Sequence, residues 1–373
     1  MSYALLTLWH ERQRYRAAVL AVGFSALLSA LQVGLLFGLF SITSMPIDST
    51  RAHIWVGAPQ VRSVDLGRPI PERFLSYLAS QPEIDRCEIY MQGFSYWARP
   101  DGGTELCMVI GSRLGPDALG AVNKLTAEQR NLLTMPGAVI VDESDLKKLG
   151  INGIGDTVEV SGTRVRVVSL TKGLKSLAGP YVFCSIGTAR PLLRLQPDQI
   201  TYVLATCKNP DDAPRVVARM RDHYKKVLTA FTSSDFSWHS KLHWIGSTKA
   251  GYALGYAAAL GLLVGAVVTS QTLYAATAAS LREFAVLRAL GIPRWRMAAM
   301  VMWQAFWVGV LGLALAYPVF EGLSRLADAQ GLQIWRHWVL LAGAAALTLT
   351  MAMLSGLLAL RSLRKAEPAE LLR

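Results

Sequence analysis

The chain has 373 residues, of which 52% are hydrophobic and 17% are charged, whereas about 25% of the residues in an average soluble protein are charged. Its net charge of +12 would suit a nucleic-acid partner, but no dense Lys/Arg tract with interleaved aromatic residues stands out. The composition therefore argues against nucleic-acid binding and favours a membrane protein.

Four long uncharged runs account for the low content of charge. They cover residues 17–47, 250–281, 297–320 and 337–360, and each is longer than the roughly 20 helical residues that cross a hydrocarbon core. The first run greatly exceeds the apolar region of a cleaved signal peptide, which has about 7–15 residues. We therefore expect an uncleaved anchor, followed by a long polar segment and three clustered spans.

These runs predict the fold class and the domain organisation. We expect an integral membrane protein with four transmembrane helices (1+3) and a large extracytoplasmic α+β domain between helices 1 and 2. The predicted segments are a cytosolic interfacial helix at 1–16, a first span at 17–41, a periplasmic α+β domain at 42–249, a second span at 250–277, a cytosolic helix at 278–297, a third span at 298–320, a short periplasmic loop at 321–336, a fourth span at 337–360 and a cytosolic tail at 361–373.

Basic residues beside the spans predict the orientation. Segments 1–16, 282–296 and 361–373 together carry eleven Lys/Arg and four Asp/Glu, whereas the loop 321–336 is neutral. The positive-inside rule places such basic segments in the cytosol and exempts long translocated domains. We therefore predict a multi-pass protein of the bacterial inner membrane with both termini cytosolic and residues 42–249 outside.

The outer segment alternates between strand and helix patterns. Ser161-Gly162 sits between two alternating runs and predicts a hairpin within 155–168. The other predicted strands cover 52–56, 86–98, 104–111, 138–142, 181–186 and 200–206, and the predicted helices cover 71–80, 187–195 and 211–228. The final strand and helix resemble half of a ferredoxin-like unit.

All four cysteines lie in this outer segment, at Cys87, Cys107, Cys184 and Cys207. An oxidising compartment permits disulfides, and four cysteines allow three pairings. No CxxC spacing indicates a metal or redox site. The sequence leaves two interpretations open, a disulfide bridge and buried free thiols.

The second span contains two GxxxG pairs, formed by Gly251, Gly255, Gly261 and Gly265. Such small-residue pairs allow two helices to approach closely. One interpretation is a homodimer interface at these four glycines. The alternative is packing against the chain's own other spans.

The helical pattern continues past the second span into the segment 282–291. Phe284, Leu287 and Leu290 give this short helix apolar side chains that cannot all face lipid and a helix bundle, which favours a cytosolic partner. Gly291 suits a left-handed cap at the helix end, and Pro293 restarts the chain. The alternative is an ordinary interfacial turn.

Two motifs carry a family resemblance. Residues 283–292 (EFAVLRALGI) resemble the cytosolic coupling helix of MacB/FtsX-type ABC transporter permeases, also called type VII, and residues 364–373 (RKAEPAELLR) resemble the closing motif of that family. The one-plus-three topology around an outer domain is also similar to the family's. Size and the sequences of the first two spans look most like the DevC branch of exporter permeases, which lack a fused ATPase domain.

The resemblance implies several partners. They are a separate ABC ATPase subunit, a second copy of this chain, a periplasmic membrane-fusion adaptor and an outer-membrane channel. The sequence contains no G-x-x-x-x-G-K-[ST] loop, so ATP and Mg would be bound by the partner ATPase, and we expect no cofactor, metal or catalytic residue in this chain. The expected ATPase contacts are Arg282, Glu283, Phe284, Leu287, Arg288, Leu290 and Gly291.

The implied function is that of a permease subunit of an ABC exporter. It would transmit ATP-driven motion to its periplasmic domain and so drive export or extraction of an amphiphilic substrate. Two alternatives stay open: a permease that extracts lipoproteins or lipids, and an FtsX-like signalling scaffold that controls periplasmic hydrolases.

Other chemistry finds little support in the sequence. His239 and His243 are spaced i,i+4, but Ser240 stands where a zinc hydrolase motif requires Glu, so interfacial aromatic neighbours explain the stretch better. The S-x-x-K pattern at Ser144 and Lys147 lacks the accompanying motifs of serine acyl enzymes. No Asp, Glu, Lys or Arg lies deep within a span, which argues against an ion-coupled carrier. We therefore expect force transmission rather than catalysis.

Overall fold

The computed structural model of the protein describes residues 12–120, 124–174, 176, 178–224, 226–279, 293–329 and 334–365. The chain separates into two compact units. We call Met1–Leu39 with Lys249–Arg373 the membrane unit and Phe40–Thr248 the outer unit. The bounds of the outer unit lie within two residues of the extracytoplasmic domain predicted at 42–249.

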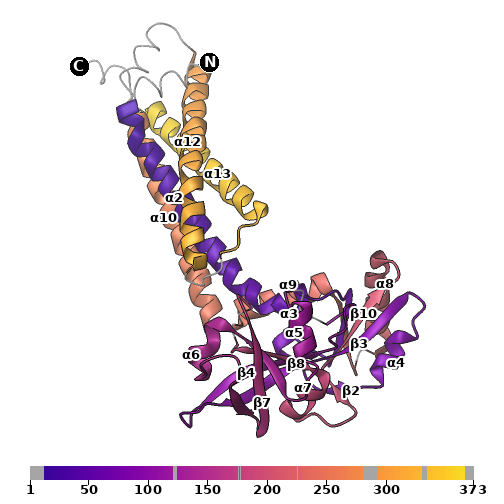
Figure 1. The fold of residues 1–373 in the computed structure, drawn as a ribbon. Coiled ribbons are helices and arrows are strands. Elements are labelled where there is room, and N and C mark those ends of the chain that lie inside the picture. The colour runs from indigo at the N-terminus through magenta and orange to yellow at the C-terminus, as the bar shows by residue number, and fades with distance from the viewer. Residues whose placement is uncertain are drawn as a thin grey trace. The chain divides into compact units, whose positions relative to one another are not determined.

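Four long helices form the described part of the membrane unit (Figure 1). They are α2 (Arg12–Ser41), α10 (Lys249–Ala279), α12 (Arg294–Ala329) and α13 (Trp338–Lys365). Each contains a stretch long and apolar enough to cross a membrane, within Tyr15–Asp48, Gly251–Thr272, Ala298–Ala327 and Trp338–Leu357. The prediction of one span before the outer unit and three after it is confirmed.

Two helices extend beyond their predicted spans. Helix α2 already begins at Arg12, so residues 12–16 continue the first span instead of belonging to a separate interfacial helix, and residues 1–11 lie outside the described part. Helix α12 runs on to Ala329, so the predicted loop 321–336 begins as helix. Arg325 Nε donates to Glu321 Oε1 at 3.0 Å, and this i,i+4 ion pair suits a helical extension.

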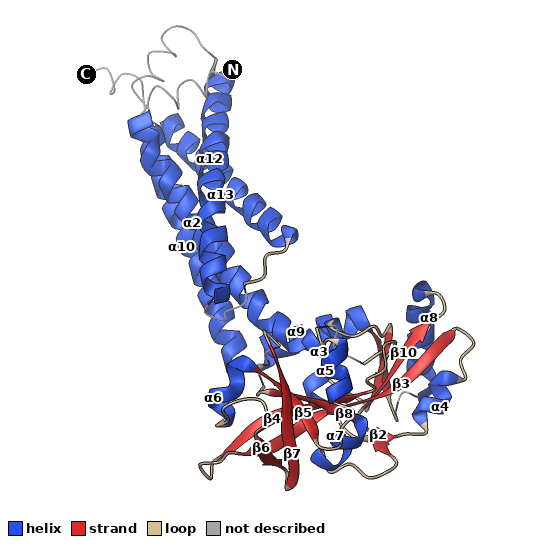
Figure 2. Cartoon of the chain, viewed as in Figure 1, coloured by secondary structure: helices blue, strands red, loops and turns tan. Residues whose placement is uncertain are grey.

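Nine strands form one mixed sheet in the described part of the outer unit (Figure 2). Their order is β11-β1-β10-β3-β4-β8-β5-β7-β6. The strands are β1 (Ile54–Gly57), β3 (Ile84–Ala98), β4 (Thr104–Ser112), β5 (Ala138–Asp142), β6 (Thr157–Val160), β7 (Thr163–Thr171), β8 (Tyr181–Ser185), β10 (Tyr202–Cys207) and β11 (Thr229–Thr232), and a separate pair joins β2 (Ile70–Pro71) to β9 (Gln199–Ile200).

The long strand β3 belongs to two parts of this sheet. Its first half pairs with β10 and its second half with β4. Its end also pairs with β6, where Trp97 lies opposite Val160, so the strands from β3 to β6 close into a ring. Closure removes the exposed strand edges on that side, and such edges are otherwise sites of aggregation.

Short helices surround the sheet. They are α3 (Met45–Asp48), α4 (Phe74–Ala79), α5 (Ala127–Leu132), α6 (Leu146–Leu149), α7 (Ile186–Leu192), α8 (Ala213–Tyr224) and α9 (Ser233–Ser247), with 3-10 turns η1 (Ile42–Ser44), η2 (Val64–Leu66), η3 (Glu143–Asp145) and η4 (Pro210–Asp212). Helix α5 starts at a capping box in which Thr126 and Gln129 satisfy each other's backbone N–H groups, which explains its sharp start.

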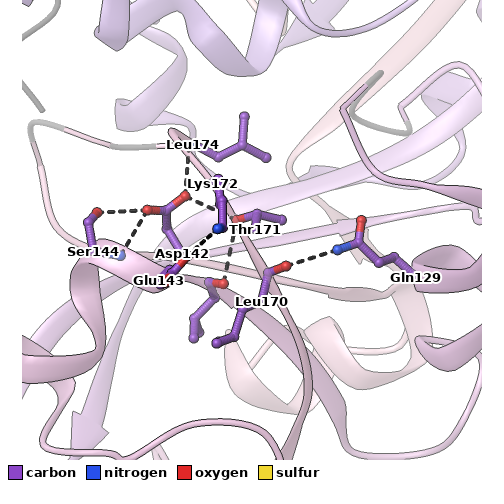
Figure 3. Close-up of polar contacts among 9 residues, drawn as sticks. Gln129, Asp142, Glu143, Ser144, Leu170, Thr171, Lys172 and Leu174 are labelled. Carbon is purple, nitrogen blue, oxygen red and sulfur yellow. Dashed lines mark hydrogen bonds and ion pairs between the residues drawn. The ribbon is translucent and has the colours of Figure 1, made fainter. Parts of the chain in front are cut away.

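Asp142 fixes the end of strand β5 (Figure 3). Its buried carboxylate accepts hydrogen bonds from Ser144 N at 3.1 Å, Ser144 Oγ at 2.7 Å, Thr171 Oγ1 at 3.2 Å and Leu174 N at 2.8 Å. The donors belong to η3, which directly follows β5, to the last residue of the parallel strand β7 and to the chain that follows β7. One side chain therefore holds three pieces of backbone together.

An aromatic cluster forms part of the core of the outer unit. Trp55, Tyr90 and Tyr202 lie on neighbouring strands, with ring centroids 5.1–6.5 Å apart. Phe236 from α9 packs against Trp55 at 5.7 Å and against Tyr202 at 5.9 Å. Each of these four side chains is almost fully buried, so α9 is anchored in the core by an aromatic side chain.

Most predicted elements of the outer unit are confirmed, including the hairpin, whose turn holds Ser161 and Gly162 at positive φ. The sequence patterns do not predict α9 and β11. Helix α9 has no clear apolar periodicity, because Trp238 and Leu242 are exposed while Ser237 and Ser240 are buried. Strand β11 has only four residues, which is too short for a pattern to be recognised.

Candidate functional site

Helix α2 crosses α12 at two glycines. A Cβ added to Gly23 would lie 3.0 Å from the carbonyl oxygen of Gly312, and a Cβ added to Gly312 would lie 3.0 Å from the backbone nitrogen of Gly23. The two backbones are therefore nearly in contact, which only small residues permit. Val22 and Val308 are fully buried beside this crossing.

Helix α10 also packs on α2, and Figure 1 shows the two side by side. A Cβ at Gly261 would lie 1.8 Å from Gln32 Oε1, and a Cβ at Gly265 would lie 3.3 Å from Ser25 Cβ. Packing within the chain thus accounts for these two glycines of the second span. A Cβ at Gly255 would meet nothing within 4 Å. The dimer interface predicted at Gly251, Gly255, Gly261 and Gly265 stays a prediction, because the structure contains one chain.

The predicted ATPase-contact residues, from Arg282 through Gly291, lie in the segment 280–292, outside the described residues. The structure describes its two flanks. Helix α10 ends at Ala279 and α12 begins at Arg294, directly after Pro293. The predicted restart of the chain at Pro293 is confirmed, and the contact residues remain predictions.

Both connections between the two units are short along the chain. Helix α2 ends at Ser41 and is followed directly by η1 and α3. The backbone angles of the cap residues of η1 and α3 are helical or nearly helical. Helix α9 ends at Ser247, and only Thr248, with φ −110° and ψ 147°, separates it from α10. One connection is therefore almost continuously helical, whereas the other contains a single extended residue.

Within the outer unit, these two connecting elements bind each other. Lys241 Nζ of α9 lies 3.3 Å from Asp48 Oδ2 of α3, and Ser44 Oγ of η1 donates to the same carboxylate oxygen at 2.7 Å. The pair is partly exposed, so the ion pair alone contributes about 1 kcal/mol or less. Its effect is to link the segment that follows the first span to the segment that precedes the second.

Buried polar side chains in the described parts of the spans are all uncharged. The hydroxyls of Ser25, Thr348 and Ser355 each donate to a carbonyl oxygen one turn earlier in the same helix, at 2.8 Å. These groups are satisfied locally and need no ion or proton partner.

The described histidines and cysteines can be compared with the geometry that a metal site requires. No group of three or more His, Cys, Asp or Glu residues in the described part of the chain could hold a metal ion. Burial lowers the pKa of His243, with help from the nearby Arg62 and His239, so a neutral imidazole is favoured there. All four cysteines are free thiols, and burial raises the pKa of Cys87 and of Cys107 to about 12.

Sequence reasoning also missed a buried carboxylate, Asp65 in η2. Its side chain is almost completely buried, and burial raises its pKa from 3.8 to about 7. Asp65 has no sequence motif around it, since a carboxylate in a Ser-Val-Asp-Leu stretch is ordinarily a turn residue on the surface. Only the folded arrangement of η2, β3 and α9 reveals it.

Two family models match the chain. Residues 17–223, more than half of the chain, match the MacB-like periplasmic core domain, and residues 255–368 match the FtsX-like permease C-terminal domain. An uncharacterized ABC transporter permease of Methanocaldococcus jannaschii is 25% identical over 234 residues, which cover 59% of this chain and 57% of that relative. The match thus spans little more than half of the relative's length.

Three solved structures show a weaker likeness. The periplasmic region of MacB from Actinobacillus actinomycetemcomitans has 14% identity and a TM-score of 0.35, covering 52% of this chain and 94% of its own. The extracellular domain of the noncanonic ABC-type transporter YknZ from Gram-positive bacteria has 11% identity and a TM-score of 0.33, covering 48% and 99%. A domain of a putative permease from Porphyromonas gingivalis has 12% identity and a TM-score of 0.30, covering 48% and 89%. The family assignment rests on the family models.

Four membrane-spanning helices and a large periplasmic α+β domain between the first and second of them define the class, a multi-pass membrane protein that carries its main folded domain outside the cytosol. With both halves matched by family models, the chain belongs to the MacB/FtsX family of ABC transporter permeases. Membership agrees with the four apolar helices in making this chain a multi-pass membrane protein.

Proposed function

We propose that this chain is the permease subunit of an ABC exporter that converts ATP-driven motion of a separate ATPase subunit into motion of its own periplasmic domain. Two copies would pair in the membrane, and each 282–291 helix would dock on an ATPase. Phe284, Leu287 and Leu290 would fill an apolar groove of the ATPase, while Arg282 and Glu283 would set the register by charge.

One observation carries this proposal, the way both spans enter the outer unit. The η1 and α3 segments follow α2 without a loop, and a single residue separates α9 from α10. Inside the outer unit, α3 and α9 are joined through Asp48 and Lys241. A shift of the two spans against each other would therefore act on one connected element, which supports force transmission.

The substrate we propose is an amphiphile, moved with the help of a membrane-fusion adaptor and an outer-membrane channel. The uncharged interior of the described spans supports this choice, because a hydrophilic cargo would require a polar path between the helices. An amphiphile can instead leave the outer leaflet without passing through the bundle. Lipoprotein or lipid extraction uses the same motion with a different cargo, and FtsX-like signalling uses it with no cargo.

A single substitution in the predicted coupling helix tests the docking step. We expect Leu287→Asp to leave the protein inserted and paired, and to abolish ATPase stimulation and transport by the reconstituted complex, because a carboxylate cannot enter an apolar groove. Ala289→Asp, on the opposite side of the predicted helix, is the matched control and should retain activity. Full activity of the Leu287 variant would refute the docking role.

Reconstitution also separates the three functions. Vesicles that contain the permease, the ATPase and a labelled amphiphile should lose label from the membrane only when ATP and the adaptor are both present. Release of an acylated protein in place of the free amphiphile would favour extraction. ATP-dependent change in the outer domain with no loss of any cargo would favour signalling.

A further inference from the structure

Asp65 is held in the outer unit between the sheet and the helix that leads into the second span. Gln92 Nε2 of β3 donates to Asp65 Oδ1 at 3.0 Å. The indole N–H of Trp244, on α9, lies against the same carboxyl group and donates to Ser63 Oγ at 3.2 Å. The side chain of Asp65 is 3% exposed, so it is removed from solvent.

Among the described residues, no cation pairs with this carboxyl group. The titratable groups that face it are Tyr90 of β3, Tyr181 of β8 and Tyr202 of β10, and burial raises the pKa of each, so their hydroxyls stay neutral. On α9, His243 interacts with Arg62 and His239 instead. Among the described residues Asp65 forms no ion pair. An ionised carboxylate would therefore be buried without a counter-charge, which is costly.

One neighbouring acceptor also lacks a donor. Gln92 Oε1 is buried and has no hydrogen-bond partner, although the Nε2 of the same amide is bonded to Asp65. A buried acceptor without a donor costs about 1–3 kcal/mol. A proton on Asp65 would supply the missing donor, because a carboxylic acid and a primary amide can exchange two hydrogen bonds.

We propose that Asp65 is a proton-binding site and that its neutral carboxyl group forms a two-hydrogen-bond pair with the amide of Gln92. The proton comes from water and adds to a carboxylate oxygen; no other bond is made or broken. The amide then donates through Nε2 and accepts through Oε1, and both groups are satisfied. Burial, which raises the pKa of Asp65 to about 7, agrees with this assignment.

The Asp65–Gln92 pair stabilises the packing of α9 against the sheet. Val64 N, next to Asp65, donates to the buried Ser240 Oγ of α9 at 3.1 Å, and Tyr202 Oη donates to Val64 O at 2.8 Å. Loss of the proton leaves a buried anion and again leaves Gln92 Oε1 without a donor. Deprotonation should therefore loosen α9 from the sheet just before the second span.

The sign of the pH dependence follows from the raised pKa. The protonated carboxyl group of Asp65 contributes its full stability below the unfolded pKa of 3.8. This contribution falls as the pH rises and is lost above the folded pKa of about 7. Between these values the equilibrium constant for opening rises up to tenfold per pH unit. Acidification of the periplasm would thus tighten the connection between α9 and the sheet.

Infrared spectroscopy of the full chain in lipid nanodiscs tests the site directly. At about pH 5, below the folded pKa but above that of ordinary carboxyl groups, we expect a carbonyl band of a protonated carboxylic acid that disappears at about pH 9. Asp65→Asn should remove this band. Asp142→Asn is the matched control and should retain the band. All four hydrogen-bond partners of the Asp142 carboxylate are donors, so no neighbouring acceptor there needs a proton.

Hydrogen exchange of α9 gives a second measurement. In the wild type, protection of α9 amides, corrected for intrinsic rates, should fall as the pH rises towards 7. In Asp65→Asn it should stay constant, since an amide–amide pair with Gln92 keeps both hydrogen bonds and does not titrate. If that variant fails to fold, Gln92→Met should shift the acid band to the frequency of a free carboxyl group. A band unaffected by Asp65→Asn or by Gln92→Met would overturn the proposal.

Discussion

The crossing of α2 and α12 at Gly23 and Gly312 makes a quantitative prediction for the membrane unit. Gly312→Ala would place a methyl group 3.0 Å from the backbone nitrogen of Gly23 and 2.9 Å from Val22 Cγ1. Because backbone atoms cannot move aside as a flexible side chain can, the two helices must separate. Overpacking of this kind costs about 1–3 kcal/mol.

The intrinsic helix preference of alanine works in the opposite direction. Replacing glycine by alanine inside a helix stabilises it by about 0.8–1.0 kcal/mol. A suitable control is Gly322→Ala, because Gly322 lies in the same helix and a Cβ there would meet nothing within 4 Å. The helix preference of alanine cancels in the difference between the free energies of unfolding of the two variants. We expect Gly312→Ala to be less stable than Gly322→Ala by about 1–3 kcal/mol.

Reversible unfolding of the full chain in mixed detergent–lipid micelles measures this difference. Tryptophan fluorescence follows the unfolding transition. All variants are unfolded in the same reducing buffer, so the cysteines can be kept. The result that would refute the reasoning is a Gly312→Ala variant as stable as Gly322→Ala. That outcome would mean that α2 and α12 do not approach closely at this point.

Two further predictions concern the second span and the thiols. Gly261→Ala should destabilise the membrane unit less than Gly312→Ala does, because the new methyl group would meet Gln32 Oε1, the far end of a flexible side chain that can turn aside. The double variant with Gln32→Ala should recover part of the loss, with a coupling energy of about 0.5–3 kcal/mol in a double-mutant cycle, and additive losses would contradict the contact. Maleimide should label the folded protein very slowly near neutral pH and faster as the pH is raised, since burial keeps the pKa of the most exposed thiol at about 12. Denaturation should release four reactive thiols at once, and rapid labelling of the native chain would count against the burial of Cys107, Cys184 and Cys207 and against the raised pKa of the partly buried Cys87.

The transmembrane helices and the position of the outer unit could be predicted because they depend on strong sequence signals. About 20 uncharged residues in a row have few alternatives to a membrane span. Strands such as 138–142 and 181–186 were also predictable, since continuous Val, Ile and Phe runs suit a strand that is buried on both faces. These signals are local, and each can be read without knowledge of the rest of the chain.

Features that depend on distant partners could not be predicted. The ring closure between Trp97 and Val160 joins segments whose sequences contain nothing specific to that pairing. Gly261 and Gly265 match a GxxxG motif, but the motif does not say whether its partner is a second chain or α2. Asp65 could not be recognised either, because its chemistry comes from burial and from Gln92, 27 positions away along the chain.

The contrast between the two connections has a consequence for changes in chain length. The first connection is almost continuously helical from α2 through α3, so one inserted residue would turn everything beyond it by about 100°, given about 3.6 residues per turn. At Thr248 the backbone is already extended, and its two soft dihedral angles can take up such an insertion. Length variation among natural variants of this protein should therefore concentrate near Thr248, while the helical phase between Ser41 and Met45 should be preserved.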